Sequence, residues 1–191
     1  MIETSGNNMK LTLTLSLLLL SACSTMQGFV GGNLEKTRAS ISDPLIREDI
    51  DAAQEAAIAA EKRAPMDPIV ALLAADAHER FGDEVAAQTS LNRAIALEPQ
   101  GEIMALALKN RACLAMRSGN PEQAQQDFSA AYEACGGDNS LLRNLGAAAY
   151  AAGDFPSARQ AWQKLPLADR RSIDLIVGPG FFEPTSVALS R

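Results

Sequence analysis

The sequence predicts an all-α protein built from stacked helical hairpins, and two observations carry this prediction. Alanine supplies 34 of the 191 residues while aromatic residues make up only 5%, a composition that favours closely packed helices over strands. Glycine is followed by Asp or Asn at Gly82, Gly119 and Gly153, each time between two helix-like stretches. The intervals of 37 and 34 residues between these glycines indicate an internal repeat, which we expect to stack into a solenoid.

The overall composition is that of one ordinary globular domain. Hydrophobic residues make up 47% and charged residues 21% of the chain, which excludes a disordered polymer. The formal net charge is -6 and the isoelectric point is about 4.8. Because binding to nucleic acid requires a basic surface that neutralises phosphates, this charge argues against nucleic acid as a partner.

Residues 1–22 have the pattern of an export signal. Residues 11–20 read LTLTLSLLLL after Lys10, a short apolar core behind one positive charge. With the two small residues that follow, this run has 12 residues, whereas a helix that spans a bilayer needs roughly 20. It is therefore too short for an ordinary transmembrane anchor. Residues 1–8 contain Glu3 and no positive charge, so we expect translation to begin at Met9.

The segment Leu20-Ser21-Ala22-Cys23 resembles the lipobox of bacterial lipoproteins. The resemblance implies cleavage before Cys23 and attachment of lipid to its sulfur and to its new amino group; an ordinary secretory cleavage site is the alternative. Several acyl chains together hold a protein stably on a bilayer. Ser24, and not Asp, follows the cysteine. By resemblance to enterobacterial sorting this implies the periplasm-facing side of the outer membrane, with the inner membrane as the alternative.

The remaining elements follow in order along the chain. Residues 23–42 contain several glycines and no apolar periodicity, so we expect a flexible tether there. The folded domain is predicted at 43–177. It begins with one long capping helix at 43–63, continues with hairpins at 68–101, at 105–138 and from 139 onward, and closes with a helix at 167–177. Gly178 ends that helix, and the tail at 178–191 is expected either to fold back or to remain disordered.

The body resembles the tetratricopeptide repeat, whose helix-turn-helix unit has 34 residues. The residues that match the family pattern are Ala87, Leu91, Ala94, Leu97 and Pro99 in the first repeat, Ala112, Gly119, Ala124, Phe128 and Ala131 in the second, and Leu145, Gly146, Tyr150, Gly153, Ala158 and Trp162 in the third. The resemblance implies an α-solenoid of about three hairpins with terminal capping helices. An armadillo-like stack is the alternative, although its repeats are nearer 40 residues long.

The sequence offers no recognisable catalytic constellation, so we expect no enzymatic activity, cofactor or metal site. His78 is the one histidine, and it occupies a repeat position that usually carries Tyr, which favours a packing role. The cysteines that remain after lipidation are Cys113 and Cys135. The helical register places them roughly 10 Å apart along the helix axis, so we expect two buried small side chains, with a disulfide as the alternative.

A repeat stack acts by binding, and the first helices of its hairpins line the concave side. The predicted partner-binding residues there are Ile69, Leu72, Asp76 and Glu79, then Leu106, Lys109, Cys113 and Met116, then Arg143, Ala147 and Tyr150. An apolar floor with charged ends suits an extended or helical segment of another protein. The alternative is that individual members pack between repeats. The carboxylate-clamp pattern of chaperone-binding repeat proteins is not matched at Leu72, Asp76 and Cys113.

A small lipidated repeat protein resembles the pilus-assembly lipoproteins of tight-adherence systems and the pilotins that place secretin rings. Residues 138–146 carry the closest local likeness. The resemblance implies an outer-membrane assembly factor or scaffold with a secretin or another envelope component as its protein partner. The alternatives are a general scaffold for peptidoglycan or outer-membrane protein biogenesis, and an accessory subunit of an envelope hydrolase.

Overall fold

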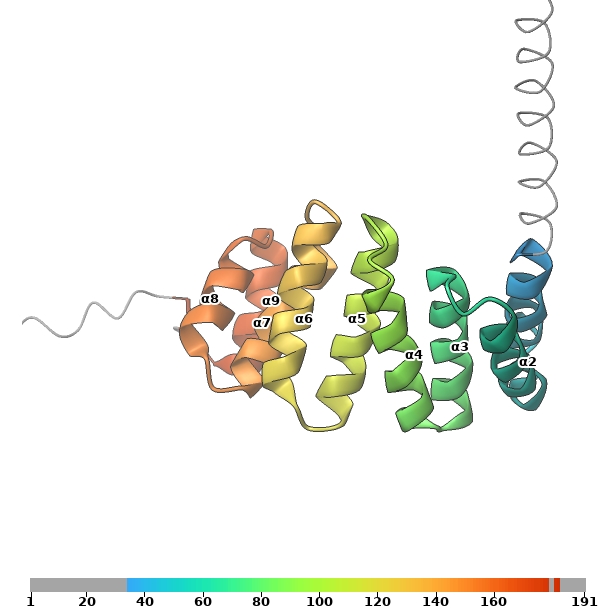
Figure 1. Ribbon diagram of the computed structural model, residues 1–191. Helices are drawn as coiled ribbons and strands as arrows, with labels where there is room; N and C mark the ends of the chain where they lie inside the picture. Colours follow the sequence, from blue (N-terminus) through green and yellow to red (C-terminus); the bar gives the residue numbers. More distant parts are fainter. Residues whose placement is uncertain (1–33, 179–180, 183–191) are drawn as a thin grey trace, which may run out of the picture.

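The computed structural model describes residues 34–178 and 181–182, and within these residues it contains helices and no strand (Figure 1). Residues 34–46 form the first helix. It is followed by α2 (Ile50–Arg63), α3 (Pro68–Phe81), α4 (Glu84–Ala96), α5 (Glu102–Arg117), α6 (Pro121–Ala134), α7 (Asn139–Ala151), α8 (Phe155–Gln163) and α9 (Leu167–Val177). The predicted all-α solenoid is confirmed.

The helices form a single row in which neighbours in sequence are neighbours in space (Figure 1). Residues 34–46 pair with α2, and the next hairpins are α3 with α4, α5 with α6 and α7 with α8. The last helix, α9, packs Ile173 against Leu142 of α7 and Trp162 of α8. The described part of the chain therefore holds four hairpins, one more than the sequence predicted. The turns within hairpins lie along the lower edge of Figure 1 and the turns between hairpins along the upper edge.

Short polar signals start and stop these helices. Gly82 ends α3 with a φ of +91°, a left-handed conformation that glycine adopts without steric cost. Asp83 then caps α4, because its side chain accepts a hydrogen bond from the backbone N–H of Ala86 at 2.9 Å. The pairs Gly119-Asn120 and Gly153-Asp154 repeat this arrangement before α6 and α8. One dipeptide thus ends the first helix of a hairpin and begins the second.

The buried residues form clusters that follow one another along the row and consist mainly of small side chains. In the second helices the fully buried alanines are Ala53, Ala57, Ala60, Ala87, Ala94, Ala124, Ala131 and Ala158. Each packs with larger residues of the same or adjacent helices, such as Leu91 and Phe128. Because a methyl group adds little width, paired helices approach closely, and each hairpin must bury its remaining apolar face against the next one.

The N-terminal part differs from the prediction. Residues 34–46, most of which were expected in the tether, form a helix that buries Ile41 and Leu45 against Ala53 and Ala57. The single helix expected at 43–63 is interrupted at Glu48, which has a φ of +59°, before α2 begins. The tether boundary and the long helix were therefore wrong. This helix contains few apolar residues and depends on tertiary packing, which periodicity does not detect.

Other predictions concern residues that the structure does not describe. The export signal, Cys23 and residues 24–33 all lie outside the described residues. Of the tail, only residues 178, 181 and 182 are described, and Phe181 folds back onto α8, where its carbonyl oxygen accepts a hydrogen bond from Arg159 Nε–H at 2.6 Å. Among the described residues, no helix is both long and apolar enough to cross a bilayer.

Candidate functional site

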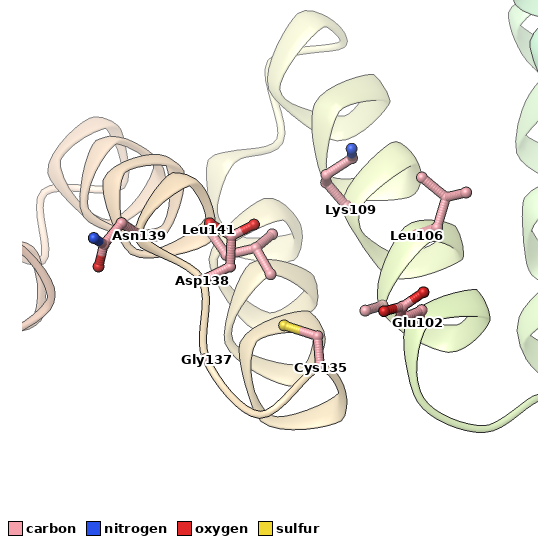
Figure 2. A pocket seen from close by; sticks show the side chains of 9 residues that line it. Glu102, Leu106, Lys109, Cys135, Gly137, Asp138, Asn139 and Leu141 are labelled. Atoms are coloured by element: carbon pink, nitrogen blue, oxygen red, sulfur yellow. The ribbon is translucent and has the colours of Figure 1, made fainter.

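A groove of about 740 Å³ opens between the N-terminal half of α5 and the turn from α6 to α7 (Figure 2). Its lining residues are Glu102, Ala105, Leu106, Lys109, Cys135, Gly137, Asp138, Asn139 and Leu141. Because α5 and α7 are the first helices of successive hairpins, the groove lies on the side of the row where the sequence predicted partner binding. Its volume falls within the range of typical ligand sites, roughly 300–1,000 Å³.

One wall of the groove is a stripe on α5. Glu102, Leu106 and Lys109 are spaced three to four residues apart and so share one face of the helix. The adjoining face of the same helix buries Leu108 and Ala112 in the core between α5 and α6. Leu106 lines the groove with 42% of its surface exposed. Its apolar side chain is therefore available for contact with a partner.

The facing wall is the first turn of α7. Asp138 caps this helix, and its carboxylate accepts hydrogen bonds from Ser140 N–H at 2.7 Å and from Ser140 Oγ–H at 2.9 Å. These two bonds, aided by the charges of Lys109 and Arg143, lower the pKa of Asp138 below its ordinary value. Asp138 therefore remains ionised at neutral pH, and its oxygens are already engaged within the chain.

Most of the predicted charged residues are paired within the protein. The ion pairs on the first-helix side are Asp76 with Arg80 at 3.1 Å, Glu79 with Arg117 at 3.0 Å and Arg143 with Asp169 at 3.2 Å. Lys109 makes no ion pair within 4.0 Å with any residue in the described ranges. Of the two cations predicted to hold a partner, Lys109 is thus the one whose charge remains available at the groove.

The predicted apolar floor is only partly exposed. Leu72 is 7% exposed and packs in the core with Leu91 and Ala107, so its prediction as a contact residue is wrong. Tyr150 is 38% exposed, and one side of its ring packs against aromatic residues of its own chain, with ring centroids 5.2 to 6.0 Å from those of Phe155, Trp162 and Phe181. Ile69 and Met116 are half-buried, and Ala147 is exposed. The exposure of these residues depends on how the helices stack, which cannot be predicted from the register of a single repeat.

Cys113 and Cys135 are free thiols. Both are half-buried, less than the full burial that the sequence predicted, and they pack as small side chains against the core of the α5–α6 hairpin. Burial raises the pKa of the Cys113 thiol. Cys135 lines the groove (Figure 2), and its Sγ lies 3.7 Å from the carbonyl oxygen of Tyr132.

His78 belongs to a buried polar network that joins α2, α3 and α4. Its Nδ1 lies 2.7 Å from Gln54 Oε1, and its Nε2 lies 3.6 Å from Glu61 Oε2. Glu61 also accepts a hydrogen bond from Ser90 Oγ–H at 2.6 Å and pairs with Arg93. The network gives the imidazole a structural role, and no group of metal-ligating residues is found elsewhere in the described part of the chain.

The same network sets the protonation of Glu61. Burial by itself raises the pKa of this carboxyl, but the polar contact with His78, the hydrogen bond from Ser90 and the charge of Arg93 outweigh burial and lower the pKa to about 2. The network escaped sequence reasoning because its members are far apart in the chain. The occupation of a usual Tyr position by His78 was the one available signal.

Comparisons with known proteins agree with this architecture. The family model "Tetratricopeptide repeat" matches residues 47–102 and 109–169. No curated protein matches the chain. Three similar solved structures are the MamA protein, a tetratricopeptide repeat protein from Parabacteroides merdae, and a mutant O-GlcNAc transferase from Thermobaculum terrenum.

These structural likenesses cover most of the present chain. The MamA protein has 18% identity and a TM-score of 0.61 over 75% of this chain and 75% of its own. The Parabacteroides protein has 21% identity and a TM-score of 0.63 over 78% of this chain and 59% of its own. The transferase has 21% identity and a TM-score of 0.59 over 74% of this chain but only 26% of its own. At such identities the likeness concerns the fold alone.

Proposed function

Because the chain belongs to the tetratricopeptide repeat family, we propose that it is a lipid-anchored scaffold that binds a protein partner in the groove between α5 and the start of α7. The repeats themselves indicate a protein-interaction scaffold. The groove on the first-helix side is the observation that carries the more specific proposal. It combines an open apolar contact, Leu106, with a cation, Lys109, that has no ion pair among the described residues.

The arrangement supports a particular kind of partner segment. An apolar side chain of the partner contacts Leu106, and a carboxylate pairs with Lys109 one helical turn away. Two carboxylates line the groove together with this cation, Glu102 on the same helix and Asp138 on the facing wall, so an extended run of acidic residues would meet repulsion there. The groove therefore suits a segment with a single acidic residue beside an apolar one, rather than the strongly acidic segment that two free cations would have accepted.

We propose further that the protein is not an enzyme. This is supported by the engagement of His78 with Gln54 and Glu61 inside the helix stack, where His78 is only 3% exposed. The groove itself contains carboxylates, one amine and one thiol, without a base oriented toward a nucleophile. Binding alone accounts for these residues.

The location and the biological setting rest on the sequence. The lipobox-like segment that ends at Cys23 supports a lipid anchor, and Ser24 supports the periplasm-facing side of the outer membrane, with the inner membrane as the alternative. A scaffold so placed suits the assembly of a pilus or secretion system, with a secretin or another envelope component as the partner. These finer assignments follow the resemblance to pilus-assembly lipoproteins and pilotins.

The test is cross-linking of the full chain to its partner in intact bacterial envelopes. We expect Lys109→Glu and Leu106→Ser each to remove the same cross-linked protein. Lys62→Glu is the matched control, because Lys62 is an exposed lysine of α2, the second helix of its hairpin. Recovery of the same cross-linked protein with all variants would refute the proposal that the groove is the binding site. If the two groove variants instead lose a cross-linked protein that is neither a secretin nor a pilus component, the groove is supported as the binding site and the assembly role is refuted.

A further inference from the structure

A second surface has features that the groove does not explain. Large apolar side chains are exposed along the edge formed by the turns within hairpins, which is the lower edge in Figure 1. They are Ile46 at the end of the first helix, Phe81 and Val85 on the two sides of the α3–α4 turn, and Phe155 at the start of α8. Their exposed fractions are 79%, 51%, 79% and 48%. We call these four residues and the turns that carry them the turn edge.

The most prominent part of the turn edge is shaped as a ridge between two hollows. A hollow of about 480 Å³ is lined by Phe81, Gly82, Asp83, Glu84 and Val85. A second hollow, of about 280 Å³, is lined by Glu84, Val85, Gln88, Thr89, Leu114 and Ser118. Glu84 and Val85 belong to both. The inward face of α4 buries Ala87 and Leu91, so packing within the solenoid makes no use of Val85.

The turn edge is also strongly acidic, because acidic side chains cap or begin the second helices there. Its carboxylates are Glu48, Asp49, Asp51, Asp83, Glu84, Glu122 and Asp154. Of the arginines at this edge, Arg80 and Arg117 are already paired with Asp76 and Glu79, and Arg47, next to Ile46, is exposed but outnumbered by the carboxylates. The result is a row of exposed apolar side chains set in a negative field, a combination that marks an interaction surface.

We propose that the turn edge, centred on Phe81, Glu84 and Val85, binds a basic amphipathic helix of another protein. Apolar residues of that helix contact Val85 and enter the two hollows, while its Lys or Arg side chains pair with Glu84 and its acidic neighbours. The charge decides between occupants. A second copy of this chain would bring the same negative edge, and an anionic membrane surface would be repelled in the same way.

The position of the turn edge agrees with a protein partner. The first helix begins at the upper edge of the row and ends at the lower one (Figure 1). A helix of its length, residues 34–46, spans roughly 20 Å. The described part of the chain therefore begins at the edge opposite Phe81 and Val85. The proposal stands independently of the groove, because the turn edge lies on other turns. The turn edge favours a basic partner segment, whereas the groove favours a segment with an acidic residue.

The experiment measures binding of a synthetic 18-residue Leu/Lys amphipathic peptide to the full chain in neutral phosphatidylcholine nanodiscs, with empty nanodiscs as the reference. Two further peptides serve as comparisons, a scrambled one of the same composition and a Leu/Glu one of the same pattern. We expect Val85→Ser and Glu84→Lys each to weaken binding about five- to tenfold. Met66→Ser is the matched control, because Met66 is 76% exposed at the opposite edge.

The outcomes separate the possible occupants. Selective binding of the Leu/Lys helix that Val85→Ser weakens, and that Met66→Ser and Lys109→Glu leave unchanged, supports the proposal; circular dichroism checks that each variant is folded. Equal binding of the scrambled peptide, or equal loss with Met66→Ser, would overturn it. The proposal would also be overturned if the chain formed a dimer, or bound phosphatidylglycerol vesicles, and Val85→Ser abolished that association. Loss of groove binding with Lys109→Glu has no bearing on these results.

Discussion

Gly146 of α7 faces the indole of Trp162 in α8, and replacing it with alanine tests how tightly the hairpin is packed. A Cβ at this position would fall well inside contact distance of Nε1, Cδ1 and Cε2 of the Trp162 indole. The indole has little room to move, since it packs among Leu142, Leu165 and Ile173. Its Nε1–H also donates a hydrogen bond to the carbonyl oxygen of Arg143 at 3.0 Å.

The expected loss of stability follows from these contacts. Overpacking a well-filled core costs about 1–3 kcal/mol, and the loss of the buried indole hydrogen bond costs about 1–3 kcal/mol more. Alanine returns about 1 kcal/mol through its higher helix propensity. We therefore expect Gly146→Ala to lower the free energy of unfolding by about 1–5 kcal/mol. For a chain of this length that corresponds to a fall in Tm of roughly 2–20 °C.

Urea unfolding followed by circular dichroism measures this change, and a second substitution identifies its cause. Trp162 is the one tryptophan in the chain, so its fluorescence reports directly on the site. In a Trp162→Leu background the clash is gone, and adding Gly146→Ala should leave stability unchanged or raise it by up to about 1 kcal/mol. An increase in stability with Gly146→Ala alone would refute the reasoning, because helix propensity would then outweigh contact with the indole.

Four further outcomes are expected. Cys23→Ala should leave the protein as a soluble or uncleaved precursor, as judged by mass and membrane fractionation; a processed variant that still partitions with membranes would contradict the lipid anchor. Circular dichroism should show helix content well above the globular average of about one third and no strand signal. Asp127→Ala should cost roughly 3 kcal/mol in urea unfolding, since it leaves Arg111, now paired at 2.7 Å, without its partner. The lowered pKa of Glu61, about 2 against an ordinary 4.5, stabilises the fold fully above pH 4.5, and this stability, on the order of 2–3 kcal/mol, should disappear as the pH falls from 4.5 to 2. Glu61→Gln should remove that part of the pH dependence of the urea midpoint.

The sequence alone determined the parts of this protein that depend on neighbouring residues. The Gly82-Asp83 turn is an example, because the left-handed glycine and the capping carboxylate act within one helical turn. The buried alanines were likewise predicted from their register, since spacing along one helix decides which residues share a face. For the same reason the α5 stripe of Leu106 and Lys109 was identified as part of one surface before the groove was seen.

The tertiary structure decided what depends on contacts between distant residues. Leu72 lies on the first-helix face by register, yet packing against Leu91 and Ala107 places it in the core. Arg143 is a free cation by its position in the repeat, but α9 brings Asp169 to within 3.2 Å of it. The pairing of Gln54 with His78 joins residues 24 positions apart. Periodicity records the direction in which a side chain points on its own helix, whereas burial, ion pairing and the choice of binding residues depend on which other helix lies opposite.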